Sequence, residues 1–136
     1  MIVSHMPLGP TLYIGLKNVI MRHDLKKKPE AMSEAFPHLI FNNFKTPLGI
    51  RLKKILQHLF PTPKFESKRV ITFSNKNDLI SFRHHTYEKL DYKTVNLNEI
   101  GPRFEMKAYQ ISLGTLIQSE AQKEWILRPY MNTASK

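Results

Sequence analysis

The sequence predicts an α/β fold in which a mixed β-sheet packs against helices. Residues 101–114 alternate apolar and polar side chains between two glycines, which is typical of a half-buried strand. Residues 46–60 instead repeat large aliphatic side chains at helical spacing and stop at a proline. The chain has 136 residues, of which 41% are hydrophobic and 24% charged, and this composition fits one globular domain spanning residues 1–136.

The strand predicted at residues 101–114 organises the rest of the chain. Phe104, Met106 and Ala108 fall on one face of an extended segment, and mainly charged side chains fall on the other. The segment opens with a Gly-Pro pair, and proline cannot donate a hydrogen bond to a sheet. The pair therefore marks the beginning of the strand.

The segments before residue 46 predict two strands and one short helix, separated by breaks. A short apolar run occupies residues 1–3, and residues 11–21 are rich in strand-forming side chains, with Gly15 as a bulge or a point of close backbone approach. Residues 30–36 predict a short helix that a following proline ends, and residues 38–41 predict a short buried strand.

The strongest helix prediction covers residues 46–60. Thr46 can cap the amino end, Pro47 suits the first helical position, and Pro61 follows the last turn. The predicted buried stripe contains Leu48, Leu52, Ile55, Leu56, Leu59 and Phe60.

The remaining segments predict further strands. Residues 69–74 and 79–87 favour an antiparallel hairpin because the four residues between them are turn formers. Residues 95–100 contain another short repeat of apolar side chains, at Val95, Leu97 and Ile100. Residues 118–127 fit either a polar helix or a loop followed by a strand, with Trp125 as the anchor.

The charge of the chain favours an anionic partner. Its 21 Lys and Arg against 11 Asp and Glu give a net charge of +10 and a pI of about 9.9, a balance typical of nucleic-acid-binding domains that also suits anionic membrane surfaces. Residues 45–69 hold seven basic side chains and one acidic one, the densest positive region. The lysine run at residues 26–28 fits either a solvated loop or a contact surface.

The sequence favours a protein without catalytic, metal or cofactor sites. It contains no Cys, and His84 and His85 would point to opposite faces of a strand, so they cannot chelate one ion together. The acidic residues show no paired arrangement suited to hydrolysis. No apolar run approaches the roughly 18 residues of a membrane span, and no secretory signal is visible, so we expect a soluble intracellular protein.

Several motifs together resemble one family. The predicted strand at residues 101–114 begins with Gly-Pro-Arg-Phe-Glu and ends with Leu-Gly, and further motifs lie at Ser4–Thr11, Val19–Asp24, Arg69–Phe73, Ile80–His85 and Pro129–Ala134. These segments resemble the Brix-domain family of ribosome-assembly proteins. The resemblance extends from about Ile2 to Lys136 and implies the C-terminal half of a Brix domain, with the N-terminal half absent.

The resemblance implies an α/β fold like the anticodon-binding domain of class II aminoacyl-tRNA synthetases. It also implies a nucleolar RNA-binding protein that supports pairing of the U3 snoRNA with pre-rRNA and the early cleavages of small-subunit rRNA. The implied partners are U3 snoRNA, pre-rRNA and other proteins of the small-subunit processome, with no membrane and no small-molecule substrate.

Charge and location nominate a set of RNA-binding residues: Arg51, Lys53, Lys54, Lys68, Arg69, Arg83 and Arg103. The role of Arg103 is open, because it could contact RNA or pair with Glu105 or a backbone carbonyl. The competing hypothesis is a protein-interaction scaffold with little direct RNA binding, and a third is a truncated product without function. A partner groove predicts an apolar patch beside the basic helix, whereas RNA binding predicts a continuous positive stripe.

Overall fold

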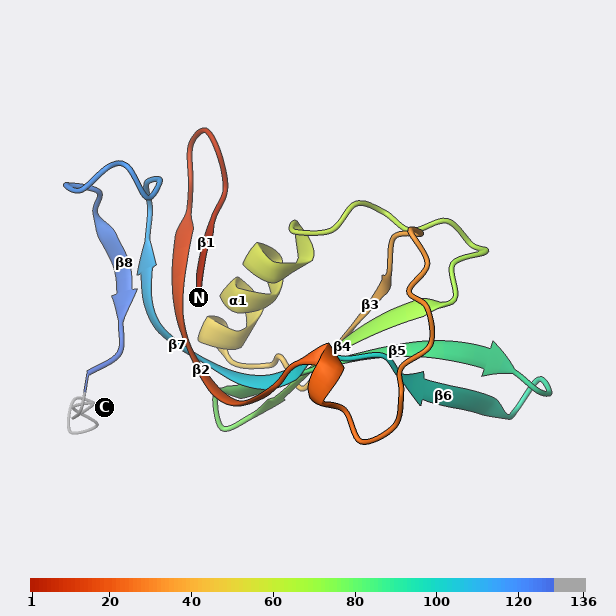
Figure 1. Cartoon of the computed structure of the whole chain (residues 1–136). Helices are drawn as coiled ribbons and strands as arrows, with labels where there is room; N and C mark the ends of the chain where they lie inside the picture. The colour runs from red at the N-terminus through yellow and green to blue at the C-terminus, as the bar shows by residue number, and fades with distance from the viewer. Residues whose placement is uncertain (129–136) are drawn as a thin grey trace. The chain divides into compact units, whose positions relative to one another are not determined.

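The computed structural model describes residues 1–128 and confirms an α/β fold (Figure 1). Its elements, in order, are β1 (Ile2–Ser4), β2 (Thr11–Ile20), the short 3-10 helix η1 (Arg22–Asp24), β3 (His38–Asn42), α1 (Pro47–Gln57), β4 (Arg69–Lys76), β5 (Leu79–Lys89), β6 (Val95–Glu99), β7 (Arg103–Ser112) and β8 (Lys123–Ile126). The Pro129–Ala134 motif lies outside the described residues. The expected likeness to an anticodon-binding domain stays a prediction.

The chain forms two compact units, and the first contains Met1–Gly15 and the described residues from Lys107 onward. In this unit β1 pairs antiparallel with β2, and β8 pairs antiparallel with β7, where Trp125 lies opposite Ile111. Residues 118–127 are therefore a loop followed by a strand, one of the two predicted alternatives. The buried Thr11 hydroxyl donates to the Gly114 carbonyl at 2.7 Å and fixes the beginning of β2.

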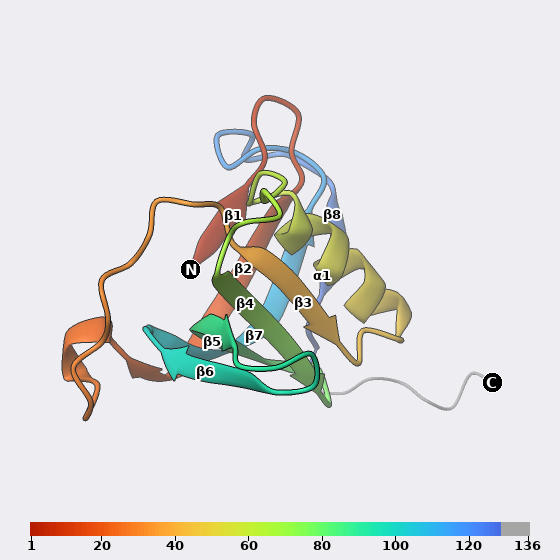
Figure 2. The same cartoon turned by 90° about the vertical axis from the view of Figure 1, so that its right-hand side faces the viewer.

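The second unit, Leu16–Met106, contains the mixed sheet and the helix. Its strands are ordered β7, β5, β4, β3, and β6 also pairs with β5. β3 runs parallel to β4, while β4 pairs antiparallel with β5 and β5 with β6. Parallel neighbours require a crossover connection, and α1 lies in that connection. Figure 2 shows α1 running alongside β3.

A row of phenylalanine rings crosses this sheet. Phe41, Phe73 and Phe82 lie directly opposite one another on β3, β4 and β5. Phe41 and Phe73 stack with ring centroids 5.0 Å apart, Phe73 meets Phe82 edge to face at 5.5 Å, and Phe82 stacks on Phe104 at 4.6 Å. Phe44 extends the row with an edge contact of 5.4 Å to Phe41. The rings tie together the four neighbouring strands of the unit.

Helix α1 begins as the sequence predicts. The Thr46 hydroxyl accepts a hydrogen bond from the Gly49 amide at 3.0 Å, and Pro47 is the first helical residue. The helix buries Gly49, Leu52, Ile55 and Leu56.

Among the described residues, no helix is long and apolar enough to cross a bilayer.

The predicted end of this helix was wrong. The last helical residue is Gln57, because the Leu59 amide donates to the Leu56 carbonyl in a tighter three-residue turn. Leu59 consequently leaves the buried stripe and is 43% exposed.

The helix predicted at residues 30–36 was also wrong, since this segment is irregular. The carbonyls of Ser33 and Ala35, which a helix would use internally, accept hydrogen bonds from the Arg69 guanidinium instead. The Glu30 carboxylate accepts from Asn98 and Thr86 of neighbouring strands. Tertiary contacts therefore override the weak local preference of this segment.

Three further strand predictions need refinement. Residues 38–41 do form β3, but it is an edge strand on which Ile40 is 49% exposed, so the predicted burial was wrong. The β4–β5 hairpin is confirmed with a shorter turn, because only Asn77 and Asp78 lie between the strands, both with positive φ as in a type I′ turn. A Cβ at Gly15 would make an ordinary van der Waals contact, 3.7 Å from the Lys107 carbonyl oxygen, so the packing at this position does not require glycine.

Replacement of Gly101 should destabilise the fold. Gly101 has φ +57°, and a Cβ there would lie 2.9 Å from Leu25 Cδ1. We expect Gly101→Ala to lower the free energy of unfolding by about 1–2 kcal/mol, the usual cost of the left-handed region for a residue with a side chain. Urea unfolding measures this loss. Gly15→Ala is the matched control and should be nearly neutral; equal effects at the two positions would contradict the assignment.

Candidate nucleic-acid interface

All seven nominated basic residues lie in the second unit, and three of them are on α1. At about 100° per residue, Arg51 and Lys53 flank the buried stripe on opposite sides and Lys54 lies between them on the outer surface. Lys53 and Lys54 are exposed, and Arg51 is half-buried. The three cations are therefore spread over about 160° of the outer surface of the helix, where the exposed Ile50 also lies.

A groove of about 720 Å³ lies along the boundary of α1 and β3. Its lining consists of His38, Leu39, Phe41, Lys53, Gln57, His58, Phe60, Pro61, Thr62 and Pro63. The Lys53 ammonium lies 5.7 Å from the centroid of the Phe41 ring. The groove thus combines a cation with aromatic carbon, the two features by which proteins hold unpaired nucleotides.

Lys68 lies beside a second hollow, which we call the loop hollow, of about 400 Å³. It is lined by His38, Phe65, Glu66, Lys68, Tyr87, Glu88 and Lys89. The Phe65 ring is 94% exposed. Our sequence reasoning missed Phe65 as a candidate contact, although the adjacent Lys64 and Phe65 offered the combination of charge and ring that single-strand binding uses.

The half-buried Arg69 side chain binds other groups of the protein. Its guanidinium donates to the carbonyls of Ala35 and Ser33, at 2.6 Å and 3.1 Å, and its Nε donates to His84 Nε2 at 3.3 Å. Burial lowers the pKa of Arg69 below its ordinary value. This side chain holds the segment before β3 against the sheet.

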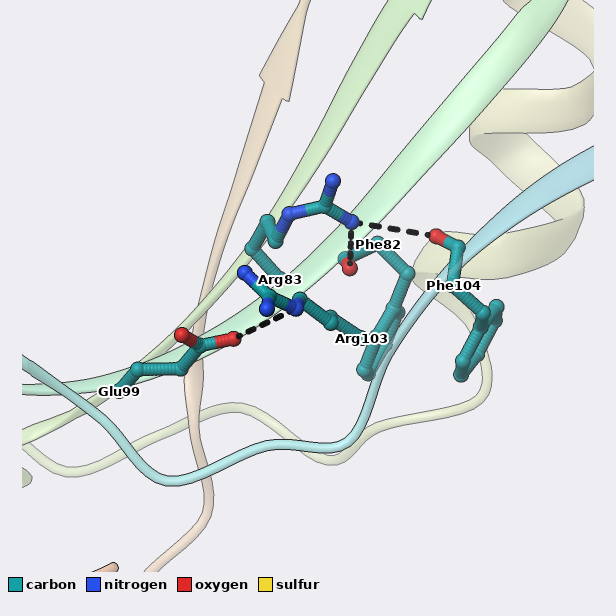
Figure 3. A network of polar contacts seen from close by, with 5 residues as sticks. All are labelled: Phe82, Arg83, Glu99, Arg103 and Phe104. Carbon is teal, nitrogen blue, oxygen red and sulfur yellow. Dashed lines mark hydrogen bonds and ion pairs between the residues drawn. The ribbon is translucent and has the colours of Figure 1, made fainter. Parts of the chain in front are cut away.

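Arg83 and Arg103 also contact protein atoms (Figure 3). Arg83 donates to the carbonyls of Phe82 and Phe104, at 2.8 Å and 3.3 Å. The Arg103 Nε lies 3.7 Å from the Glu99 carboxylate. The partner of Arg103 is therefore Glu99, which lies four residues earlier in the chain.

The expected alternative partner, Glu105, accepts a hydrogen bond from the Asn18 amide at 3.0 Å. Among the nominated lysines, Lys53, Lys54 and Lys68 are all exposed. Their role in RNA binding remains a prediction.

His84 is the buried polar centre of the sheet. It is 3% exposed, its Nδ1 lies 3.1 Å from the Gly101 carbonyl, and its Nε2 accepts from Arg69, so the proton of the neutral ring is on Nδ1. Burial lowers the pKa of His84, and the nearby Arg69, His85 and Arg22 lower it further, against the hydrogen bond to Gly101. Among residues 1–128, no three metal-ligating side chains converge on one point.

The chain matches one protein family and is similar to proteins of several organisms. Residues 1–110 match the family model described as the Brix domain. The chain is 56% identical over its whole length to the U3 small nucleolar ribonucleoprotein protein IMP4 of Rattus norvegicus, covering 47% of that protein. It is 51% identical over 96% of its length to imp4 of Schizosaccharomyces pombe, covering 45% of that protein. The chain spans about half the length of the curated relatives it matches.

Acid should destabilise the fold through His84. Because its pKa is lowered in the folded state, the unfolded chain binds more protons as the pH falls below the ordinary value of 6.5, and the free energy of unfolding decreases across that window. His84→Asn retains a donor for Gly101 but cannot titrate. We expect urea unfolding between about pH 8 and pH 5 to show a shallower decline for this variant than for wild type. Parallel declines would contradict this role of His84.

Proposed function

Because this chain belongs to the Brix-domain family, we propose that it is an RNA-binding component of a U3 small nucleolar ribonucleoprotein that acts in ribosome assembly. The proposed partners are U3 snoRNA, pre-rRNA and proteins of the small-subunit processome, and the proposed location is the nucleolus. In this role the protein supports pairing of U3 snoRNA with pre-rRNA and the early cleavages of small-subunit rRNA. It acts by binding and positioning RNA, without covalent chemistry. The similar proteins of Rattus norvegicus and Schizosaccharomyces pombe, both named as U3 small nucleolar ribonucleoprotein proteins, support this assignment.

The groove between α1 and β3 is the observation that carries the RNA-binding proposal. Lys53 extends over the Phe41 ring at one wall, and Phe60 lines the same groove. An unpaired base can pack against Phe60 and the edge of the Phe41 ring, while its phosphate faces the ammonium of Lys53 or Lys54. The exposed side of α1 then continues the contact to neighbouring phosphates.

Single-stranded or distorted RNA fits this surface better than a regular duplex. The groove exposes aromatic and proline carbon at Phe41, Phe60 and Pro61, which requires bases that are not already stacked in a helix. Recognition by such a surface depends on stacking and charge more than on hydrogen bonds to base edges. We therefore expect RNA shape, more than a linear sequence, to determine affinity.

The test compares RNA binding across a salt series. In the variant with Arg51, Lys53 and Lys54 changed to Ser, the salt dependence should become shallower, because each phosphate contact to a single strand contributes about −0.7 to the slope of log K against log salt. If all three cations contact phosphates, the slope should change by about 2. Fluorescence anisotropy with a labelled single-stranded U3-type RNA measures both slopes.

The matched control changes Lys26, Lys27 and Lys28 to Ser, which removes the same charge from a loop of the same unit. This control should retain most of the wild-type slope if α1 is the contact surface. Equal slopes for wild type and the α1 variant would instead show that α1 is only a solvated face. Protein scaffolding would then become the preferred account of the chain.

A further inference from the structure

The sheet of the second unit has an open face opposite the phenylalanine row. Successive side chains of a strand point to opposite faces, so Val70 and Thr72 point away from the side occupied by Phe73. Ile40 lies opposite Thr72, and His85 lies opposite Val70, and these cross-strand neighbours share the same face. The second face of the sheet therefore continues from β3 across β4 to β5 and β6.

This open face contains an apolar recess of about 380 Å³. The recess is lined by His38, Ile40, Val70, Thr72, His85, Tyr87, Lys89, Val95 and Leu97. Ile40, Val95 and Leu97 are 49%, 50% and 56% exposed. Single exposed aliphatic side chains are ordinary, but several that line one recess are typical of an interaction surface.

Lysines line the recess and two hollows that share residues with it. Lys89 lines it directly, and the adjoining loop hollow, which shares His38 and Tyr87 with the recess, adds Lys68. A further hollow of about 270 Å³, which shares Leu97, is lined by Leu25, Lys26, Lys27, Lys28, Glu30, Asn98, Glu99 and Arg103.

The acidic residues of this rim are fewer and partly engaged. Glu30 accepts hydrogen bonds from Thr86 and Asn98, and Glu99 lies beside Arg103. Glu66 and Glu88, which line the loop hollow, complete the set of carboxylates in these three linings. The three linings together contain six Lys and Arg side chains and four carboxylates. This excess of positive charge favours an acidic partner.

The centre of the recess favours a protein segment over RNA. RNA bases stack on aromatic rings or guanidinium planes, whereas the exposed centre here consists of the aliphatic side chains Ile40, Val95 and Leu97. The ring of Tyr87 is held in place, because its hydroxyl donates to the Ser67 carbonyl at 3.0 Å and its ring centroid lies 6.3 Å from that of His38. Such a surface fits aliphatic side chains that project from a partner.

We propose that the open face docks an acidic amphipathic helix of a partner protein. Leucine-like side chains at positions i, i+3, i+4 and i+7 of that helix fill the recess, and carboxylates on its flanks face Lys89, Lys68 and the lysines at residues 26–28. This surface lies on the opposite side of the sheet from the Phe41 ring of the RNA groove. One chain can therefore contact RNA and protein at the same time.

The first experiment measures binding of a synthetic helical peptide with leucines at i, i+3, i+4 and i+7 and glutamates on both flanks. Its counterpart has lysines in place of the glutamates. By fluorescence anisotropy, the acidic peptide should bind at least about tenfold more tightly than the lysine peptide, since charge complementarity excludes like-charged partners. Equal affinity of the two peptides, or binding of neither, would overturn the proposal.

The second experiment locates the contact. Val95→Thr with Leu97→Thr should weaken binding of the acidic peptide by about tenfold, because it removes exposed aliphatic contacts while retaining strand-forming side chains. Leu116→Thr with Ile117→Thr, which alters two exposed aliphatic residues of the first unit, is the matched control and should leave affinity unchanged. Circular-dichroism melting checks that both double variants remain folded.

The two proposed surfaces can be tested independently. The variant with Arg51, Lys53 and Lys54 changed to Ser should bind the acidic peptide as wild type does, even if it loses RNA. If an oligouridylate RNA displaces the peptide and is itself weakened by the Val95 and Leu97 substitutions, the open face binds RNA, and the protein-docking proposal is overturned.

Discussion

The structure of the second unit depends on the row of phenylalanine rings across β3, β4, β5 and β7. Each aromatic pair contributes about 0.5–1.5 kcal/mol beyond the burial of its area, and the rings meet only in the observed strand register. Phe41 lies on a strand parallel to that of Phe73, and parallel neighbours require the crossover that contains α1. The position of Lys53 over Phe41 follows from this arrangement.

The same strand register also creates the open face of the sheet that contains the apolar recess. Because side chains alternate along a strand, fixing Phe73 and Phe82 on one face fixes Val70 and Thr72 on the other. A slip of one residue would exchange the two faces and expose the rings. The groove between α1 and β3 and the apolar recess are therefore linked through the backbone of β3 and β4, and His38 is the one residue that lines both.

Local chemistry made much of this fold predictable. The cap at Thr46, the hairpin joined near Asn77 and the alternating strand after Pro102 all depend on neighbours within a few residues. The family resemblance was likewise confirmed. The irregular segment at residues 30–36 was not predictable, because its carbonyls are satisfied by Arg69, more than 30 residues away in sequence. For the same reason, charge alone could not separate the exposed lysines from arginines that donate to the protein's own backbone.

The crossover between β3 and β4 has a consequence for folding order. Strands β4 and β5 are joined by two residues, whereas β3 reaches β4 only after residues 43–68 have closed into a loop. Loop closure loses more chain entropy for the longer connection, and an edge strand is held on one side only. We therefore expect β3 and α1 to add late and to open first, as faster amide exchange in β3 than in β4 would show. The groove between α1 and β3 would then lie on the part of the sheet that rearranges at the lowest free energy.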